Sequence, residues 1–170
     1  AEAQKLMQQA RELYGIPKDE KLPLKFEMPE NSMSAEKLTL LTDALANLGV
    51  ELLIKTKKSY EYYGQVRSSD SDLFIYTWIG DFADPLAFLE LFRSDSSLND
   101  AFWKNKDYDA LIDQAAVLSD EERYKLLAQA EVLLLDDCII VPLYHPVISN
   151  VIDLNTVGGW TENAFDIHPL

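Results

Sequence analysis

In the first half of the chain, segments with the hydrophobic spacing of a helix alternate with segments that have the spacing of a β-strand. Apolar residues recur at helical spacing in two segments, which predicts amphipathic helices over residues 3–14 and 34–48. Alternating or continuous apolar runs predict strands over residues 22–28, 50–56 and 72–78. With a short helix expected over residues 60–67, helices and strands alternate along this half. That order is typical of a layered α/β sheet with helices on its faces.

The second half is predicted to be mainly helical. Helices are expected over residues 85–92, 107–118 and 119–136. The apolar run from Ile139 to Tyr144 predicts a further strand, which Pro142 restricts to an edge or an irregular position, and residues 147–152 predict another. No linker-like composition divides the chain. We therefore expect one α/β domain over residues 1–170, with a mixed β-sheet flanked by helices.

The most informative segment joins a predicted buried strand to a helix start. The apolar run Leu73–Tyr76 leads to Trp78, and a polar turn then presents Asp81 and Asp84 before Pro85. Ligands of α/β sheets bind where strands end, because the backbone opens into a crevice there. A flat aromatic ring beside a carboxylate suits a ligand with an apolar body and a positive end. The segment therefore favours binding over a reaction.

The individual residues of this turn leave alternatives open. Asp84 directly precedes Pro85, a typical helix start, so we expect Asp84 to be a cap. Asp81 could bind a ligand or bond its own backbone, as turn aspartates do. Trp78 could line a pocket or belong to the core. A pair of catalytic carboxylates is the least favoured interpretation.

Composition narrows the function classes. The 170-residue chain is 48% hydrophobic and 26% charged, as is ordinary for a globular protein, and its net charge of −14 disfavours nucleic acid as a partner. Cys138 is the single cysteine, and His145 and His168 lie far apart in sequence without an acidic cluster beside either. No serine-hydrolase or phosphate-loop motif occurs. We expect a binding protein, with no enzyme activity, no metal and no cofactor.

Several segments, in order, resemble the family 5 extracytoplasmic solute-binding proteins, the oligopeptide- and dipeptide-binding components of ABC importers. The most specific is Trp78–Pro85, followed by Phe88-Leu89. The resemblance continues through residues 92–99, 105–112, 123–131 and 139–144, and upstream through the first helix and residues 44–50. It implies a periplasmic-binding-protein-like II fold, of which this chain is the second, C-terminal lobe.

The resemblance also implies a function and partners. The chain would capture peptides outside the cytoplasmic membrane, as a periplasmic protein or an anchored lipoprotein. Its partners would be a peptide, an ABC permease and the N-terminal lobe of the same protein. Asp81 would pair with the peptide's α-amine, Trp78 would border the neighbouring pocket, and Asn99 would face the cleft. Ile75 stands where some members carry an arginine for a peptide carboxylate, so ligand length stays open.

Two other functions remain compatible with the sequence. The family includes binders of nickel complexes and oligosaccharides, so the solute could differ. Alternatively, the chain could be a module that docks a permease or another protein and holds no small ligand.

Overall fold

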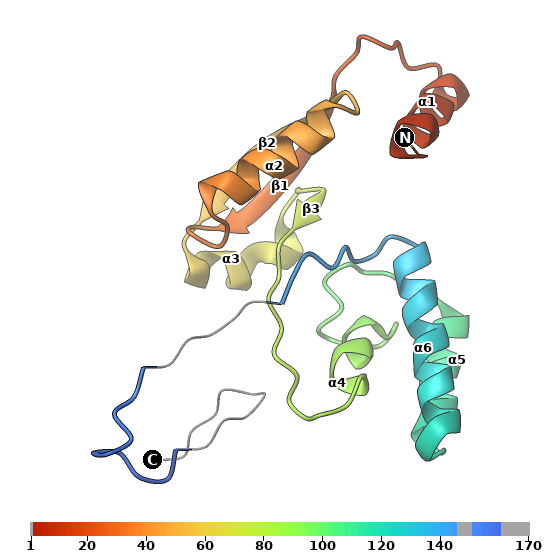
Figure 1. Ribbon diagram of the computed structural model, residues 1–170. Helices are drawn as coiled ribbons and strands as arrows, with labels where there is room; N and C mark the ends of the chain where they lie inside the picture. The colour runs from red at the N-terminus through yellow and green to blue at the C-terminus, as the bar shows by residue number, and fades with distance from the viewer. Residues whose placement is uncertain (1, 146–150, 161–170) are drawn as a thin grey trace. The chain divides into compact units, whose positions relative to one another are not determined.

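A parallel three-stranded sheet organises the first of two units in the computed structural model. The structure describes residues 2–145 and 151–160, and the chain divides into units of residues 1–77 and 78–170. In the first unit the sheet order is β2-β1-β3, and α2 runs alongside the β1–β2 pair (Figure 1). The elements of this unit are α1 (Glu2–Tyr14), β1 (Leu22–Pro29), α2 (Ala35–Ala46), β2 (Val50–Lys57), α3 (Ser59–Gln65), the 3-10 turn η1 (Val66–Ser68) and β3 (Leu73–Phe74).

The β1–α2–β2 arrangement follows from local sequence signals. Ser34 caps α2 by accepting a hydrogen bond from the Lys37 N–H at 3.4 Å. Gly49, at φ +75°, ends the connection after α2 in the left-handed region that favours glycine. The chain then returns as β2, whose Val50 pairs with Leu22 in parallel register. The helix–strand order and the parallel pairing confirm the predicted α/β class.

The third strand is much shorter than its apolar run predicts. Only Leu73 and Phe74 pair with β1. At the next residue, the hydroxyl group of Tyr62 accepts a hydrogen bond from the Ile75 N–H (3.1 Å) and donates one to the Ile75 carbonyl (2.8 Å). Both backbone groups of Ile75 are therefore satisfied by a side chain of α3, which ends the strand pairing. The predicted strand over residues 72–78 is wrong beyond Phe74.

A charged group lies inside the first unit. The side chain of Glu27 on β1 is fully buried, and its carboxylate lies 2.8 Å from Lys57 Nζ and 3.5 Å from Lys55 Nζ. Ser69 donates a further hydrogen bond at 3.0 Å. Burial raises the pKa of Glu27, but the bonds from Lys57 and Ser69 and the two lysine charges outweigh it. The pKa is therefore below the usual glutamate value.

The second unit is built on a helical hairpin. Its elements are α4 (Leu86–Leu89), the 3-10 turn η2 (Glu90–Phe92), α5 (Lys106–Ala116) and α6 (Asp120–Asp136). Helices α5 and α6 lie side by side (Figure 1) and enclose most of a buried apolar cluster. The cluster comprises Leu89, Tyr108, Ile112, Ala115, Leu127, Ala130 and Leu134. Asn105 caps α5 by accepting bonds from the N–H groups of Asp107 and Tyr108.

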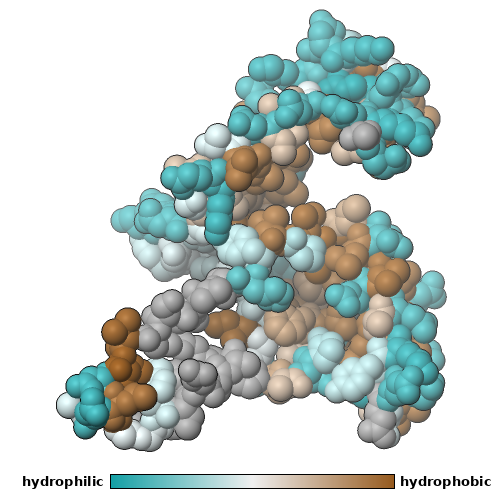
Figure 2. All heavy atoms as spheres, viewed as in Figure 1, coloured by the Kyte–Doolittle hydropathy of each residue, from teal (hydrophilic) through white to brown (hydrophobic). Residues whose placement is uncertain are grey.

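The segment after α6 does not form the strand that its sequence predicts. Residues 139–144 are irregular, and apolar side chains reach the surface of this unit (Figure 2), with Val141 70% and Leu143 53% exposed. No strand is present in the described part of the second unit, so the run has no partner there, and Pro142 lacks an N–H.

Two further predictions are only partly covered. Of the strand expected over residues 147–152, residues 147–150 lie outside the described chain, and residues 151–152 are not in a strand. All described strand pairs are parallel, so no antiparallel member of the expected mixed sheet occurs among them. The single-domain organisation stays a prediction.

Candidate functional site

The segment from Trp78 to Phe88 folds back on itself within the second unit. The indole Nε1–H of Trp78 donates to the carbonyl of Ala87 at 3.1 Å, which ties the start of the turn to α4. Gly80 lies against the ring of Phe88, and a Cβ at this position would approach that ring to 3.0 Å. Only glycine fits without a shift of the ring. We call residues 78–85 the presenting turn.

Asp84 fixes the end of the presenting turn in two ways. Its Oδ1 accepts a hydrogen bond from the Leu86 N–H at 2.8 Å, so the predicted capping role is confirmed. The same carboxylate receives a two-pronged bond from Arg123 on α6, with Nη1–Oδ2 at 2.6 Å and Nη2–Oδ1 at 2.8 Å. The hydrogen bonds from Arg123 are the main reason that the pKa of Asp84 is lowered, and the Leu86 N–H adds to them against the opposing effect of burial.

Asp81 lies in the middle of the presenting turn with its carboxylate available. The residue is exposed, and among the described residues no hydrogen bond or ion pair involves its side chain. The alternative that Asp81 bonds its own turn is therefore not realised in the described structure. Trp78 is 38% exposed, so part of its ring reaches the surface of the same short turn. The same short turn thus carries an exposed carboxylate and a partly exposed aromatic ring, residue types that suit a cationic group attached to an apolar body.

Asn99 has a different environment. It is only 4% exposed, and its Nδ2 donates to the carbonyls of Trp103 (2.7 Å) and Arg93 (3.2 Å), which closes the loop between η2 and α5. Its Oδ1 is buried without a hydrogen-bond partner among the described residues. The side chain does not belong to the presenting turn. Its predicted role at a ligand stays a prediction.

Arg123 is the residue of this region that periodicity and spacing did not reveal. Its guanidinium group is 39 residues from Asp84 in sequence, so no local pattern connects the two. One signal was available: Arg123 is a basic residue directly after Glu121 and Glu122 in the first turn of α6, where acidic residues are favoured. The position is slightly unfavourable for a cation, which is at most a weak indication of a partner such as Asp84.

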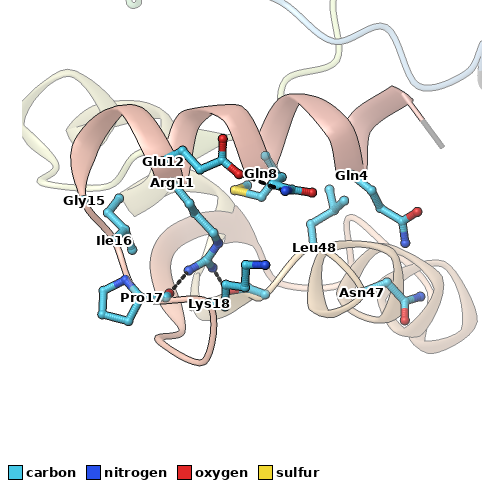
Figure 3. Close-up of a pocket in the computed structure, with 12 residues that line it drawn as sticks. Gln4, Gln8, Arg11, Glu12, Gly15, Ile16, Pro17, Lys18, Asn47 and Leu48 are labelled. Carbon is cyan, nitrogen blue, oxygen red and sulfur yellow. Dashed lines mark hydrogen bonds between the residues drawn. The ribbon is translucent and has the colours of Figure 1, made fainter.

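A cavity lies in the first unit, between α1 and the end of α2 (Figure 3). Its volume is about 610 Å³, and Gln4, Gln8, Arg11 and Leu48 point into it. Arg11 is 6% exposed and donates to the carbonyls of Pro17 (2.6 Å) and Gly49 (3.2 Å). A Cβ on Gly49 would lie 2.7 Å from Arg11 Nη2, so a side chain there would displace the end of the arginine. These bonds fasten α1 to the end of α2, a structural role.

Neither a group of candidate metal ligands nor a helix able to span a membrane occurs among the described residues. No group of three or more histidine, cysteine, aspartate or glutamate side chains among them could hold a metal ion. Among the same residues, no helix has both the length and the apolar character that a membrane span requires.

Comparison with known proteins identifies the class. The chain is 32% identical over 164 residues to the periplasmic oligopeptide-binding protein OppA of Salmonella typhimurium, which covers 94% of this chain and 29% of that protein. It is 33% identical over 114 residues to the oligopeptide-binding protein OppA of Bacillus subtilis, covering 66% and 21%. The probable deoxycholate-binding periplasmic protein YgiS of Escherichia coli is 31% identical over 144 residues, covering 81% and 26%. No family model matches the chain.

Solved structures agree. An oligopeptide ABC transporter substrate-binding domain from Bacillus anthracis superposes with a TM-score of 0.68 at 25% identity, covering 80% of this chain and 27% of that one. The chain is thus homologous to part of the family 5 solute-binding proteins of ABC importers, and the resemblance drawn from its motifs is confirmed. It spans less than a third of the length of each of these relatives.

Proposed function

We propose that this chain is the C-terminal lobe of a longer solute-binding protein that captures peptides and delivers them to an ABC permease. It would act outside the cytoplasmic membrane, free in a periplasm or anchored as a lipoprotein, and would catalyse no reaction. The limited coverage of the relatives supports the lobe assignment, and two of the relatives described above are named as oligopeptide-binding proteins.

One observation carries the peptide assignment. Asp81 is exposed and unpaired on a turn that is itself held at both ends, by Trp78 to Ala87 and by Asp84 to Arg123. A carboxylate fixed in this way is preorganised to accept the α-amine of a peptide. Such a charge-assisted bond strengthens when a second lobe closes and excludes water. The partly exposed ring of Trp78 would contact the first side chains without selecting among them.

Substitution of Asp81 tests this role. In the full-length protein, Asp81→Asn should weaken binding of a free-amine peptide by roughly 10- to 100-fold, since a bond to a charged group contributes about 1.5–3 kcal/mol. The same variant should leave binding of the N-acetylated peptide unchanged. Isothermal titration with both peptides measures the two effects.

Asp136→Asn is the matched control, because it removes an equal charge from an exposed position on α6. It should bind both peptides as the unmodified protein does. If the unmodified protein binds free and acetylated peptides equally well, the amine-binding role of Asp81 is wrong.

A different solute is the second candidate. It is favoured by the 31% identity to a protein named as a probable deoxycholate binder. An amphipathic anion would be repelled by the unpaired carboxylate of Asp81, so Asp81→Asn would strengthen its binding. For a neutral solute, Asp81→Asn would leave the affinity nearly unchanged. The direction of the change therefore separates the solute classes.

A further inference from the structure

We propose that Arg123 is a positioning residue for ligand capture: it holds the presenting turn against α6 and thereby fixes Asp81. This inference rests on the proposed function for its binding consequence. Its structural part can be tested without any ligand.

The contact between Arg123 and Asp84 has a restraining geometry. Arg123 and Asp84 form two parallel N–H···O bonds of 2.6 and 2.8 Å, and their side chains are only 18% and 17% exposed. Paired bonds of this kind restrain direction as well as distance, because the planar guanidinium group matches the planar carboxylate. The partial burial limits screening by solvent.

Few side-chain hydrogen bonds hold the presenting turn itself, although Leu89 of the adjoining α4 lies in the core cluster and its carbonyl accepts a hydrogen bond from Tyr108. Helix α4 has only four residues, too few for stability of its own. Within the described part of the second unit, the side-chain hydrogen bonds of the presenting turn are those of Trp78 and Asp84. The Trp78 bond closes the turn on α4 alone. The bond from Asp84 to Arg123 links the turn to the long helix α6.

A carboxylate distinguishes a free amine from a blocked one best when it is held in place before the ligand binds. A flexible Asp81 would lose conformational entropy whenever it paired with a ligand amine, which reduces the net gain. A turn held in place beforehand avoids most of that cost. Arg123 would therefore influence the preference for a free amine although it lies outside the ligand contact.

Hydrogen exchange of tryptophan indoles tests the structural part in the chain itself. The Trp78 Nε1–H bonds to Ala87, and the Trp103 Nε1–H bonds to Asp137 Oδ2 at 2.9 Å in the same unit, so Trp103 serves as an internal reference. In Arg123→Met, exchange of the Trp78 indole should be at least about tenfold faster, with Trp103 unchanged. An unchanged rate at Trp78, or an equal acceleration at both indoles, overturns the proposal.

Two further variants sharpen the result. Arg93→Met removes an arginine that bonds Asp113 at 2.7 Å and Asp95 at 3.1 Å, and should leave exchange at Trp78 unchanged. Arg123→Lys keeps the charge but loses the paired bonds, and should give an intermediate rate. Full protection of Trp78 in Arg123→Lys would overturn the role of the paired geometry.

The effect of Arg123 on ligand binding is tested in the full-length protein. The quantity measured is the affinity for the free peptide divided by the affinity for the acetylated peptide. A mere loss of folded protein lowers both affinities equally and leaves this ratio unchanged. Arg123→Met should reduce the ratio at least about fivefold, whereas Arg93→Met should retain it. If Asp81→Asn abolishes discrimination and Arg123→Met does not, this inference fails while the proposed function stands. If the unmodified protein binds the free and the acetylated peptide equally well, the proposed function fails. The indole exchange rates then remain as the test of the role of Arg123.

Discussion

Each unit contains a fully buried tyrosine, and the two tyrosines have different tasks. Tyr62 in the first unit bonds both backbone groups of Ile75 and so replaces a piece of β-sheet. Tyr108 in the second unit donates to the Leu89 carbonyl and stacks edge-on against Trp103 inside an apolar cluster. Burial raises the pKa of Tyr108 well above the usual value, so it stays a neutral donor.

The difference extends to the two interiors. Among the described residues of the first unit, the buried apolar side chains include Phe26, Met28, Tyr62 and Val66, and the charged Glu27 is buried with them. The second unit buries seven apolar residues in one cluster. We therefore expect hydrogen bonds and charge pairs to dominate the stability of the first unit, and apolar packing to dominate that of the second.

The largest effect is expected from a substitution that opens a cavity in the core of the second unit. Tyr108→Ala should lower the free energy of unfolding of the second unit by about 3–5 kcal/mol, because it opens a cavity among residues that pack tightly. Urea unfolding monitored through Trp103 fluorescence measures it. Val132→Ala, at a position 55% exposed on α6, should cost less than about 1 kcal/mol. A loss under about 1 kcal/mol for Tyr108→Ala would contradict the assignment of the core.

Glu27→Gln tests the polar interior of the first unit. It leaves Lys57, whose side chain is 16% exposed, without its carboxylate, and should cost about 2 kcal/mol. Amide hydrogen exchange of β1 reports the loss locally. Glu51→Gln, an exposed glutamate on β2, is the matched control and should leave the exchange unchanged. A neutral result for Glu27→Gln would mean that the buried charge is dispensable.

Acidification should act on the same group. The folded pKa of Glu27 is lowered, so its stabilising contribution is complete above the unfolded value of about 4.3 and is lost as the pH falls through the folded value. Protection of β1 should therefore decrease below about pH 5 in the unmodified chain. In Glu27→Gln this decrease should be smaller, and an identical pH profile would contradict the charge pairing.

The smallest expected effect on stability comes from removing the hydroxyl group of either buried tyrosine, and its size should differ between Tyr62 and Tyr108. Tyr62→Phe should cost about 1–2 kcal/mol, because both backbone groups of Ile75 lose their partner, whereas Tyr108→Phe removes one bond and should cost about 1 kcal/mol. Thermal unfolding of both variants provides the comparison. If Tyr62→Phe were the milder change, the hydroxyl group would not be responsible for ending β3.

Much of the local structure could be predicted from sequence. The helices, the β1–α2–β2 unit and the cap at Asp84 depend on periodicity and on residues close in the chain, which a sequence pattern records directly. The two strands that failed, beyond Phe74 and over residues 139–144, were read from apolar runs of the same kind. A strand also needs a partner edge, and an apolar run carries no information about whether one is available.

The candidate site divides in the same way. The sequence by itself determined the class of protein, through several short motifs in order along the chain, and it placed Trp78 and Asp81 in one short turn. Contact of these two residues with a ligand stays a prediction. Only the tertiary structure decided that Arg123 reaches Asp84 across 39 positions, that Tyr62 ends β3 and that the amide of Asn99 lies buried in its loop. Arg123 and Tyr62 bond groups 39 and 13 residues away, and Asn99 bonds carbonyls four and six residues away in an irregular loop. None of these contacts follows a periodic pattern, so their geometry exists only once the chain has folded.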